Sequence, residues 1–246
     1  MFEACELLGG RPFALTRHLD RLERSALGLG LPAPDRELVR RAVEEVAAAW
    51  GQDLGRVRVL WTAGEGPLGT DAAWGPPTLV VAASAVGAPR AARVEVVPWV
   101  RNERSSIAGL KTTSYAENVR ALAWAKERGA DEAIFANTRG ELCEGTGTNV
   151  FVERDGALLT PPLSSGCLAG VTRAVVLDWA REEGVDVREV DLDVAELRSA
   201  AHAALTSSTR GVVPISAVDG RELAQGPLTE KVAEIYTRRH LDEPDP

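Results

Sequence analysis

Lysine, histidine and cysteine are scarce in this sequence of 246 residues. Only three of its 28 basic residues are lysine, and it holds three histidines and three cysteines. Cys5, Cys143 and Cys167 form no CxxC pair and are too few for a disulfide framework, which is typical of a cytoplasmic protein. Because no histidine has a second histidine or a cysteine at metal-site spacing, we expect no zinc or other metal centre.

Long apolar runs are lacking as well, so a membrane-spanning helix is not expected. The formal net charge of −8 disfavours binding to nucleic acid, because an acidic surface repels a phosphate backbone. By elimination, the composition favours a protein that acts on small molecules. The length allows one domain or two closely packed lobes.

The first part of the chain mixes strand and helix signals. Gly9 and Gly10 separate two apolar runs and can supply the positive φ of a hairpin turn. Thr16 and Asp35 are candidate caps at the start of two helical patterns. The expected elements are a hairpin over 2–15, helices over 16–26 and 35–50, and strands over 56–63, 78–84 and 93–98. This order predicts an α+β lobe over residues 1–98.

A looser stretch over 99–110 is expected to link this lobe to a second one over 111–246. Ser114 opens a helical pattern that continues to Ala125. Beyond it, the expected elements are strands over 132–136, 149–153, 157–160, 185–190 and 203–207, and a helix over 171–183. The second lobe therefore also mixes strands and helices, and the predicted fold class is α+β.

Lys111 differs from the other two lysines in its surroundings. Lys126 and Lys231 each stand beside a glutamate, whereas Lys111 lies in SSIAGLKTTSY with no acidic residue within four positions. A lysine can lose its proton in a desolvated site and become a nucleophile, which an arginine effectively cannot do. This pattern suits Schiff-base chemistry, although a lysine in a surface loop would show the same local context.

Three further segments hold candidate binding groups. Glu144 lies in LCEGTGTNVF, where glycines allow close backbone approach. The helix that begins at Val171 follows TPPLSSGCLAG and offers free backbone N–H groups and the Thr172 hydroxyl to an anion. The turn LTSSTRG presents hydroxyls that either complete an anion site or form a solvated turn.

Five segments occur in an order and spacing that resemble the class IV aminotransferase family: HLDRLERSA, GLKTTSYAENV, LCEGTGTNVFV, TPPLSSGCLAGVTR and LTSSTRGVVPI. These are the fold type IV enzymes that use pyridoxal 5'-phosphate (PLP). The resemblance covers essentially the whole chain. It implies two mixed α/β lobes with the cofactor between them, and a homodimer. The family includes branched-chain aminotransferases, D-amino-acid transaminases, (R)-amine transaminases and 4-amino-4-deoxychorismate lyases.

The resemblance also assigns roles to single residues. Lys111 is expected to bind the cofactor covalently and to move the proton, while Glu144 is expected to pair with the pyridine nitrogen and keep it protonated. Tyr115 is expected near the O3' atom of the ring, and Asn149 is expected to support the Glu144 turn. The cofactor's phosphate is expected to bind Arg21, Val171, Thr172 and Ser208 or Thr209.

Residues that bind the substrate carboxylate are less clearly marked. Well-known D-amino-acid transaminases carry an arginine and a histidine where this chain has Leu68 and Thr70. Arg58 is the first alternative, as an inward arginine is in branched-chain relatives, and Arg101 or Arg104 are others. The residues leave the handedness of the substrate open.

Transamination from a D-amino acid or an (R)-amine to a 2-oxo acid is the favoured activity. The main alternative is 4-amino-4-deoxychorismate lyase, which releases pyruvate and 4-aminobenzoate, because TPPLSSGCLAGVTR especially resembles that subgroup. A non-catalytic PLP-binding protein is disfavoured, since both Lys111 and Glu144 stand within matched motifs.

Overall fold

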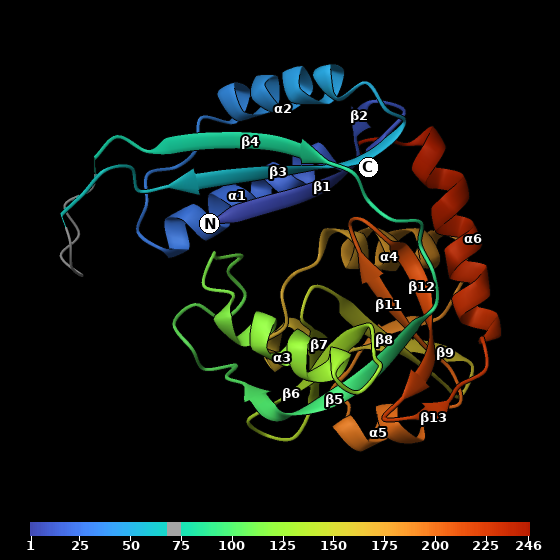
Figure 1. Cartoon of the computed structure of the whole chain (residues 1–246). Helices are drawn as coiled ribbons and strands as arrows, with labels where there is room; N and C mark the ends of the chain where they lie inside the picture. The colour runs from blue at the N-terminus through green and yellow to red at the C-terminus, as the bar shows by residue number, and fades with distance from the viewer. Residues whose placement is uncertain (68–74) are drawn as a thin grey trace. The chain divides into compact units, whose positions relative to one another are not determined.

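A computed structural model describes residues 1–67 and 75–246, and its contacts divide the chain into two compact units (Figure 1). Unit 1 comprises Met1–Gly87, Leu110–Thr113 and Glu243–Pro246, and unit 2 comprises Ala88–Gly109 and Ser114–Asp242. Each unit has its own sheet and its own buried apolar core.

The sheet of unit 1 is antiparallel, and its strand order is β2-β1-β3-β4 (Figure 1). Its strands span Phe2–Leu8 (β1), Arg11–Pro12 (β2), Leu54–Thr62 (β3) and Thr78–Ser84 (β4). Gly9 and Gly10 join β1 to β2 with φ values of 55° and 71°, which confirms the predicted hairpin and its glycine turn. Buried and less buried residues alternate along β3, as expected for a strand with one face on a core.

The helices of unit 1 span Leu15–Gly28 (α1) and Arg36–Trp50 (α2). Asp35 caps α2 as predicted, because its side chain accepts a hydrogen bond of 3.0 Å from the Leu38 N–H. The start of α1 was predicted wrongly: Ala14 is the N-cap, with φ 53°, and Thr16 lies inside the helix. The Thr16 N–H and hydroxyl instead donate to the Asp245 carboxylate at 2.8 and 2.6 Å, so a segment distant in sequence caps this helix.

The core of unit 1 forms where α1 and α2 pack on the sheet. Helix α1 contributes buried residues at positions 15, 19, 22 and 26, and α2 contributes those at 39, 43 and 47. Spacings of three and four residues place side chains on one face of a helix. The amphipathic pattern thus fixes which face of α1 meets the sheet, and it leaves other positions of α1 for the polar groups described below.

The sheet of unit 2 has the strand order β10-β9-β8-β11-β12-β5-β6-β7, with β13 paired to β12. Its strands span Ala92–Arg101 (β5), Glu132–Asn137 (β6), Leu142–Gly145 (β7), Asn149–Arg154 (β8), Ala157–Thr160 (β9), Val187–Glu189 (β10), Ala203–Ser207 (β11), Gly211–Val218 (β12) and Arg221–Glu222 (β13). Parallel pairs join β12 to β5, β5 to β6, and β9 to β10. The strands predicted here are confirmed, whereas β7 and β12 were not predicted.

The helices of unit 2 span Ala116–Lys126 (α3), Val171–Glu182 (α4), Val194–Ser199 (α5) and Pro227–Asp242 (α6), with a short 3-10 helix at Leu163–Ser165. The first two agree with the sequence predictions to within two residues. Helix α6 was missed, because its buried residues, which include Val232, Ile235 and Tyr236, are spread thinly through a polar segment.

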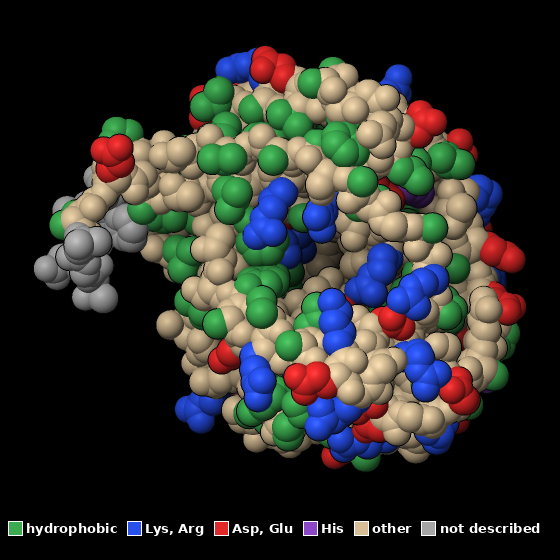
Figure 2. Space-filling model, viewed as in Figure 1, with side chains coloured by type: hydrophobic (Ala, Val, Ile, Leu, Met, Phe, Trp, Pro, Cys, Tyr) green, Lys and Arg blue, Asp and Glu red, His purple; other side chains and the backbone are tan. Residues whose placement is uncertain are grey.

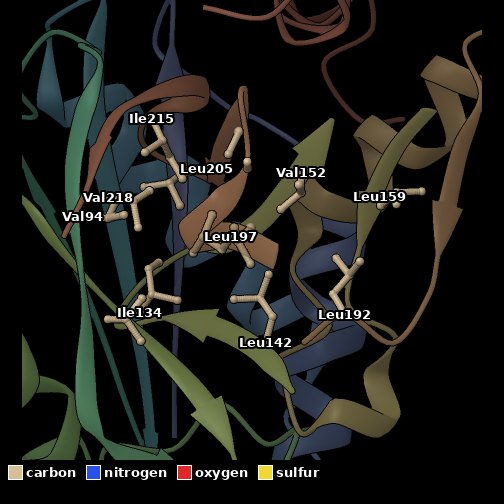
Figure 3. Packing of buried hydrophobic residues seen from close by; sticks show 14 of the residues in the cluster. Val94, Ile134, Leu142, Val152, Leu159, Leu192, Leu197, Leu205, Ile215 and Val218 are labelled. Carbon is tan, nitrogen blue, oxygen red and sulfur yellow. The ribbon is translucent and has the colours of Figure 1, made fainter. Parts of the chain in front are cut away.

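Figure 3 shows the core of unit 2, in which apolar side chains from several strands point toward one another. Val94, Ile134, Leu205 and Ile215 come from four strands of the sheet, and Leu197 comes from α5. Because this core fixes the strands, it also fixes the loops at their ends. Glu144 and Asn149 lie near the ends of strands β7 and β8 of this unit, and Ser208 and Thr209 lie in the turn that follows β11.

The two compact units do not follow the boundaries drawn from the sequence. Strand β5 is hydrogen-bonded between β12 and β6, so residues 88–109 belong to unit 2, and the stretch expected as a linker begins inside this strand. Leu110–Thr113, which include Lys111, belong to unit 1. A division into functional lobes over 1–98 and 111–246 stays a prediction.

The visible surface of unit 2 carries both signs of charge. On the face shown in Figure 2, its Lys and Arg side chains lie among Asp and Glu side chains. Several of them form ion pairs, such as Arg198 with Asp219 at 2.7 Å. No helix of the described residues is long and apolar enough to cross a membrane.

Candidate functional site

The backbone of Lys111 is held on both sides by unit 1. Its carbonyl accepts a hydrogen bond of 3.2 Å from the Phe2 N–H at the start of β1. Its N–H donates to the Ser25 hydroxyl of α1 at 3.0 Å. These two bonds fix the backbone at Lys111, so this lysine is anchored to β1 and α1 and does not lie in a loose surface loop.

Two cationic side chains contact the ring of Phe2. Lys111 Nζ is 4.4 Å from the ring centroid, and the guanidinium carbon of Arg58 is 4.2 Å from it. Cations at these distances are attracted by the ring's quadrupole, so Phe2 can hold both groups near one another despite their like charge. The structure thus brings Arg58 close to Lys111, on the same unit.

Helix α1 and strand β1 form a buried charged cluster beside this lysine. Arg21 donates two hydrogen bonds to the Glu3 carboxylate, from Nε at 2.8 Å and from Nη2 at 2.7 Å. His18 Nδ1 lies 2.7 Å from the same carboxylate, and all three residues are at most 4% exposed. The spacing of His18 and Arg21 places both on one face of α1, toward Glu3.

The charges of this cluster shift the protonation of its members. Burial alone would raise the pKa of Glu3, but the charge and hydrogen bonds of Arg21, together with those of His18, hold it well below its usual range. Burial lowers the pKa of His18, while its contact with Glu3 opposes that shift. The Glu3 carboxylate is therefore ionised, and it orients the Arg21 guanidinium by a bidentate contact.

In unit 2, Glu144 is held by the loop that precedes α4. Its Oε2 atom accepts a hydrogen bond of 2.8 Å from the Leu168 N–H. Its Oε1 atom lies 3.3 Å from Arg101 Nε, and the Arg101 guanidinium stacks 4.3 Å from the ring centroid of Phe135. The carboxylate is thus fixed from two sides, by a backbone N–H and by a cation.

Asn149 holds the same loop from its other side. Its Nδ2 atom donates to the Leu168 carbonyl at 2.9 Å. Gly170 comes so close to this amide that an added Cβ would lie 1.9 Å from Asn149 Oδ1, so only glycine fits here. The shared contact with Leu168 shows how Asn149 could support the Glu144 turn, as the sequence predicts.

The loop leads into the first turn of α4, where backbone N–H groups point outward from the helix. In the described part of the chain, no side chain caps this helix. Helix α4 packs on β11, at whose end the buried hydroxyls of Thr206 and Ser207 lack a hydrogen-bond partner among the described residues. Uncapped N–H groups and unsatisfied hydroxyls are donors that an anion can use.

The remaining predicted residues lie at several places in unit 2. Tyr115 is the N-cap of α3, and its carbonyl accepts from the Val119 N–H at 2.9 Å. Ser208 and Thr209 form the turn between β11 and β12. Arg104 is exposed, and its own N–H bonds the Asn102 side chain at 3.0 Å.

Arg101 and Arg58, both named for substrate binding, differ in their placement. Arg101 contacts Glu144, and its Nη1 atom lies 3.2 Å from Asn118 Oδ1, so its side chain is engaged inside unit 2. Arg58 lies near Lys111, as described above. Leu68 and Thr70, where an arginine and a histidine were sought, lie outside the described residues.

Glu3 and Ser25 were not singled out from the sequence, because each acts through a partner distant in the chain. A signal for His18 was present in the HLDR spacing, which places it one turn from Arg21. Thr206 and Ser207 lie in the predicted hydroxyl turn, one or two positions ahead of the residues chosen.

The cysteines do not compete with Lys111 as nucleophiles. Burial raises the pKa of Cys5 to about 12 and that of Cys167 to about 11, and it also raises the pKa of Cys143. The reactive form of a cysteine is the thiolate, so all three side chains remain inert thiols at neutral pH.

Comparison with known proteins agrees with the resemblance in the motifs. The family model described as amino-transferase class IV matches residues 1–218. The chain is 32% identical over 257 residues to a bifunctional aminodeoxychorismate lyase / D-amino acid transaminase of Mycobacterium tuberculosis, covering 96% of this chain and 87% of that protein.

Solved structures show the same fold. A branched-chain aminotransferase from Thermoproteus uzoniensis with norvaline superposes with a TM-score of 0.92 and 33% identity, covering 98% of this chain and 85% of that one. A hypothetical aminotransferase from Mycobacterium tuberculosis in its PLP-bound form gives 0.89 and 30% identity, covering 99% and 89%. The fold is therefore that of the fold type IV enzymes.

Proposed function

The chain belongs to the PLP-dependent class IV aminotransferases, and from that membership we propose that it transfers the amino group of an amino acid to a 2-oxo acid, with a D-amino acid as the favoured donor. The observation that carries the proposal is the placement of Arg58 and Lys111 against one ring, Phe2. A cation beside the nucleophilic lysine provides a partner for the carboxylate of an amino acid.

The described residues fit PLP by the chemistry of their donors. Its phosphate dianion needs several N–H and O–H donors, which the first turn of α4 and the buried hydroxyls of Thr206 and Ser207 offer. The first turn of α4 begins with Val171 and Thr172, and the turn that follows Ser207 contains Ser208 and Thr209. Arg21, oriented by Glu3, is the proposed cationic partner of the phosphate.

When bound, PLP supplies an electron sink for the bonds at the substrate Cα atom. Lys111 would hold the cofactor by a covalent bond and, once the substrate amine has displaced it, its free amine would move a proton at the substrate Cα atom. Glu144 would pair with the pyridine nitrogen and hold a proton there. Tyr115 supports the O3' side of the ring. These assignments extend the motif resemblance and constitute the proposed active site.

Arg58 is the residue proposed to bind the substrate carboxylate. Of the three arginines considered, it is the one that shares an aromatic ring with Lys111, whereas Arg101 is engaged with Glu144. A carboxylate partner favours amino acids over simple (R)-amines, which have no carboxylate. The preference for the D-form is supported by the D-amino acid transaminase activity in the name of the Mycobacterium tuberculosis relative.

A second activity has support of its own. The same relative is named both as an aminodeoxychorismate lyase and as a transaminase. The segment TPPLSSGCLAGVTR, which resembles the lyase subgroup, also forms the loop that binds Glu144 and leads into α4. The same lysine and electron sink serve elimination of pyruvate, so both activities are compatible with one site.

Substrate panels separate these activities. The purified PLP-loaded protein is mixed with D-alanine, L-leucine, (R)-1-phenylethylamine or aminodeoxychorismate. The absorption of the cofactor, the pyruvate formed and the 4-aminobenzoate formed are measured. We expect D-alanine to convert the cofactor to its pyridoxamine form, and a 2-oxo acid to restore the original spectrum.

Other outcomes contradict specific parts of the proposal. Faster conversion by L-leucine would assign the opposite handedness. Release of 4-aminobenzoate and pyruvate from aminodeoxychorismate, with no conversion by any amino donor, would make the lyase the principal activity. Binding of PLP without turnover of any of these compounds would leave the chain as a non-catalytic PLP-binding protein.

A further inference from the structure

A buried carboxylate outside the predicted site connects two of its loops. Glu132, the first residue of β6, is 3% exposed. Its Oε1 atom accepts hydrogen bonds from the Thr146 N–H at 3.1 Å and from the Thr146 hydroxyl. Its Oε2 atom accepts from Arg210 Nη2 at 2.8 Å. One side chain therefore binds two segments that are far apart in the sequence.

Both of these segments directly adjoin residues of the proposed cofactor site. Thr146 follows Glu144 by two positions, in the turn between β7 and β8. Arg210 follows Ser208 and Thr209 in the turn between β11 and β12. The Glu132 carboxylate thus ties the loop that holds the ring-nitrogen partner to the loop that holds the phosphate donors.

The surroundings leave little room for this carboxylate to move. An added Cβ at Gly145 would lie 2.1 Å from Thr148 Oγ1 and 3.3 Å from Glu132 Cδ, so the turn closes tightly over the side chain. Asn118 Nδ2 holds the Thr146 carbonyl at 2.6 Å from the other side. A buried charge in such a space needs its partner, and Arg210 supplies the matching charge.

We propose that Glu132 is a positioning residue for the cofactor site: through Arg210 it fixes the Ser208–Thr209 turn relative to the Glu144 turn, and so it sets the affinity for the phosphate group of the cofactor. The inference rests on the proposed function, since it takes these two turns as the phosphate and ring-nitrogen sites. Glu132 itself does not contact the cofactor in this role.

The substitution Glu132→Gln tests the Arg210 connection selectively. The amide oxygen of glutamine can still accept the two hydrogen bonds of Thr146. Its NH2 group then faces the Arg210 guanidinium, and because both groups are donors, no hydrogen bond forms between them. The Glu144 turn is therefore retained while the Ser208–Thr209 turn loses its anchor. Titration of the apo-protein gives dissociation constants for PLP and for pyridoxal, which has the same ring without the phosphate.

We expect Glu132→Gln to weaken PLP binding by about tenfold or more, as for loss of a hydrogen bond to a charged group. Pyridoxal binding should change by less than about twofold, because the ring contacts are retained. A merely structural role would weaken both ligands alike. Equal weakening of the two, or unchanged PLP affinity, would overturn the proposal.

Further variants complete the experiment. Arg210→Gln removes the same ion pair from its other end, so we expect it to weaken PLP binding to a similar extent, and combining it with Glu132→Gln should add little further loss. Glu153→Gln serves as a matched control, since Glu153 also accepts backbone N–H groups, from Leu228 and Thr229 at the start of α6. This control should leave the ratio of the PLP and pyridoxal constants unchanged.

Failure of the role proposed for Glu132 can be distinguished from failure of the proposed function. Failure of the unsubstituted protein to bind PLP would contradict the proposed function. Normal binding of PLP by that protein, together with an unaltered ratio in Glu132→Gln, would contradict only the role of Glu132.

Discussion

The side chains of Glu144 and Asn149 bind the backbone N–H and the backbone carbonyl of the same residue, Leu168. The Leu168 N–H donates to Glu144 Oε2 at 2.8 Å, and its carbonyl accepts from Asn149 Nδ2 at 2.9 Å. The position of the Glu144 carboxylate therefore depends on the side-chain amide of Asn149, five residues further along the chain. Because the same loop enters α4, the proposed ring-nitrogen partner and the proposed phosphate donors of α4 are held by one set of contacts.

Substitution Asn149→Ala tests this connection. Loss of one hydrogen bond between neutral groups costs about 1 kcal/mol, so we expect the dissociation constant of PLP to rise about fivefold. Titration of the apo-protein with PLP measures it. An unchanged constant, with an unchanged unfolding midpoint, would show that the loop holds its shape without Asn149.

Lys111→Ala is expected to abolish turnover and the absorption that arises from covalent attachment of the cofactor. Lys111 is the proposed nucleophile, because the sequence motif marks it and it contacts Phe2 and Ser25. Lys126→Ala is the matched control, because Lys126 ends α3 and has no part in the proposed site. An active Lys111→Ala protein with the original spectrum would refute the central assignment.

The buried cluster around Glu3 predicts a pH dependence of stability. The pKa of Glu3 lies well below the ordinary value of 4.5, so the unfolded chain takes up the proton first. Its contribution is therefore fully present above about pH 4.5 and is lost as the pH falls below that value. Urea unfolding of the apo-protein between about pH 3 and pH 7 measures the change, since this range brackets the ordinary pKa of a carboxyl group.

Glu3→Gln provides the comparison for that experiment. At neutral pH it leaves Arg21 without its buried anionic partner, and we expect a loss of about 3–5 kcal/mol in the free energy of unfolding. The variant should also lose less stability than the original protein on going from neutral to acid pH. Parallel pH profiles for the two proteins would contradict the ionised state assigned to Glu3.

Asp245→Ala is expected to destabilise α1 through its distant cap. The Asp245 carboxylate accepts from the Thr16 N–H and hydroxyl at 2.8 and 2.6 Å, and Ala14 at the N-cap offers no side-chain acceptor. Loss of a cap of this kind costs about 1 kcal/mol. Urea unfolding measures it, with Asp242→Ala at the end of α6 as the control. Equal stability of the two variants would show that solvent replaces the cap.

The sequence predicted local structure well and long-range structure poorly. Helix α2, its Asp35 cap and the glycine hairpin were correct, because each depends on neighbouring residues. The cap predicted for α1 was wrong, since the Asp245 carboxylate that caps this helix lies 229 positions away from Thr16. No periodicity within one segment reports a contact of that kind.

The candidate site shows the same division. Lys111 and Glu144 were found because motifs mark them, while their proposed roles still await experiment. Glu132 was not singled out, since its importance lies in a contact with Arg210, 78 positions away. A carboxylate at the start of a strand looks like any surface glutamate until the fold closes over it.

Arg58→Met tests how the substrate is recognised. If Arg58 binds the substrate carboxylate, the variant loses a charged hydrogen bond in the bound state, and kcat/KM for D-alanine should fall about 10- to 100-fold. An amine without a carboxylate, (R)-1-phenylethylamine, should lose nothing. Arg56→Met is the control on the same strand, where Arg56 Nη2 donates to the Ser84 hydroxyl at 3.0 Å. A similar loss for both donors would mean that Arg58 acts on Lys111 through Phe2, and the carboxylate partner would then have to be sought among other residues.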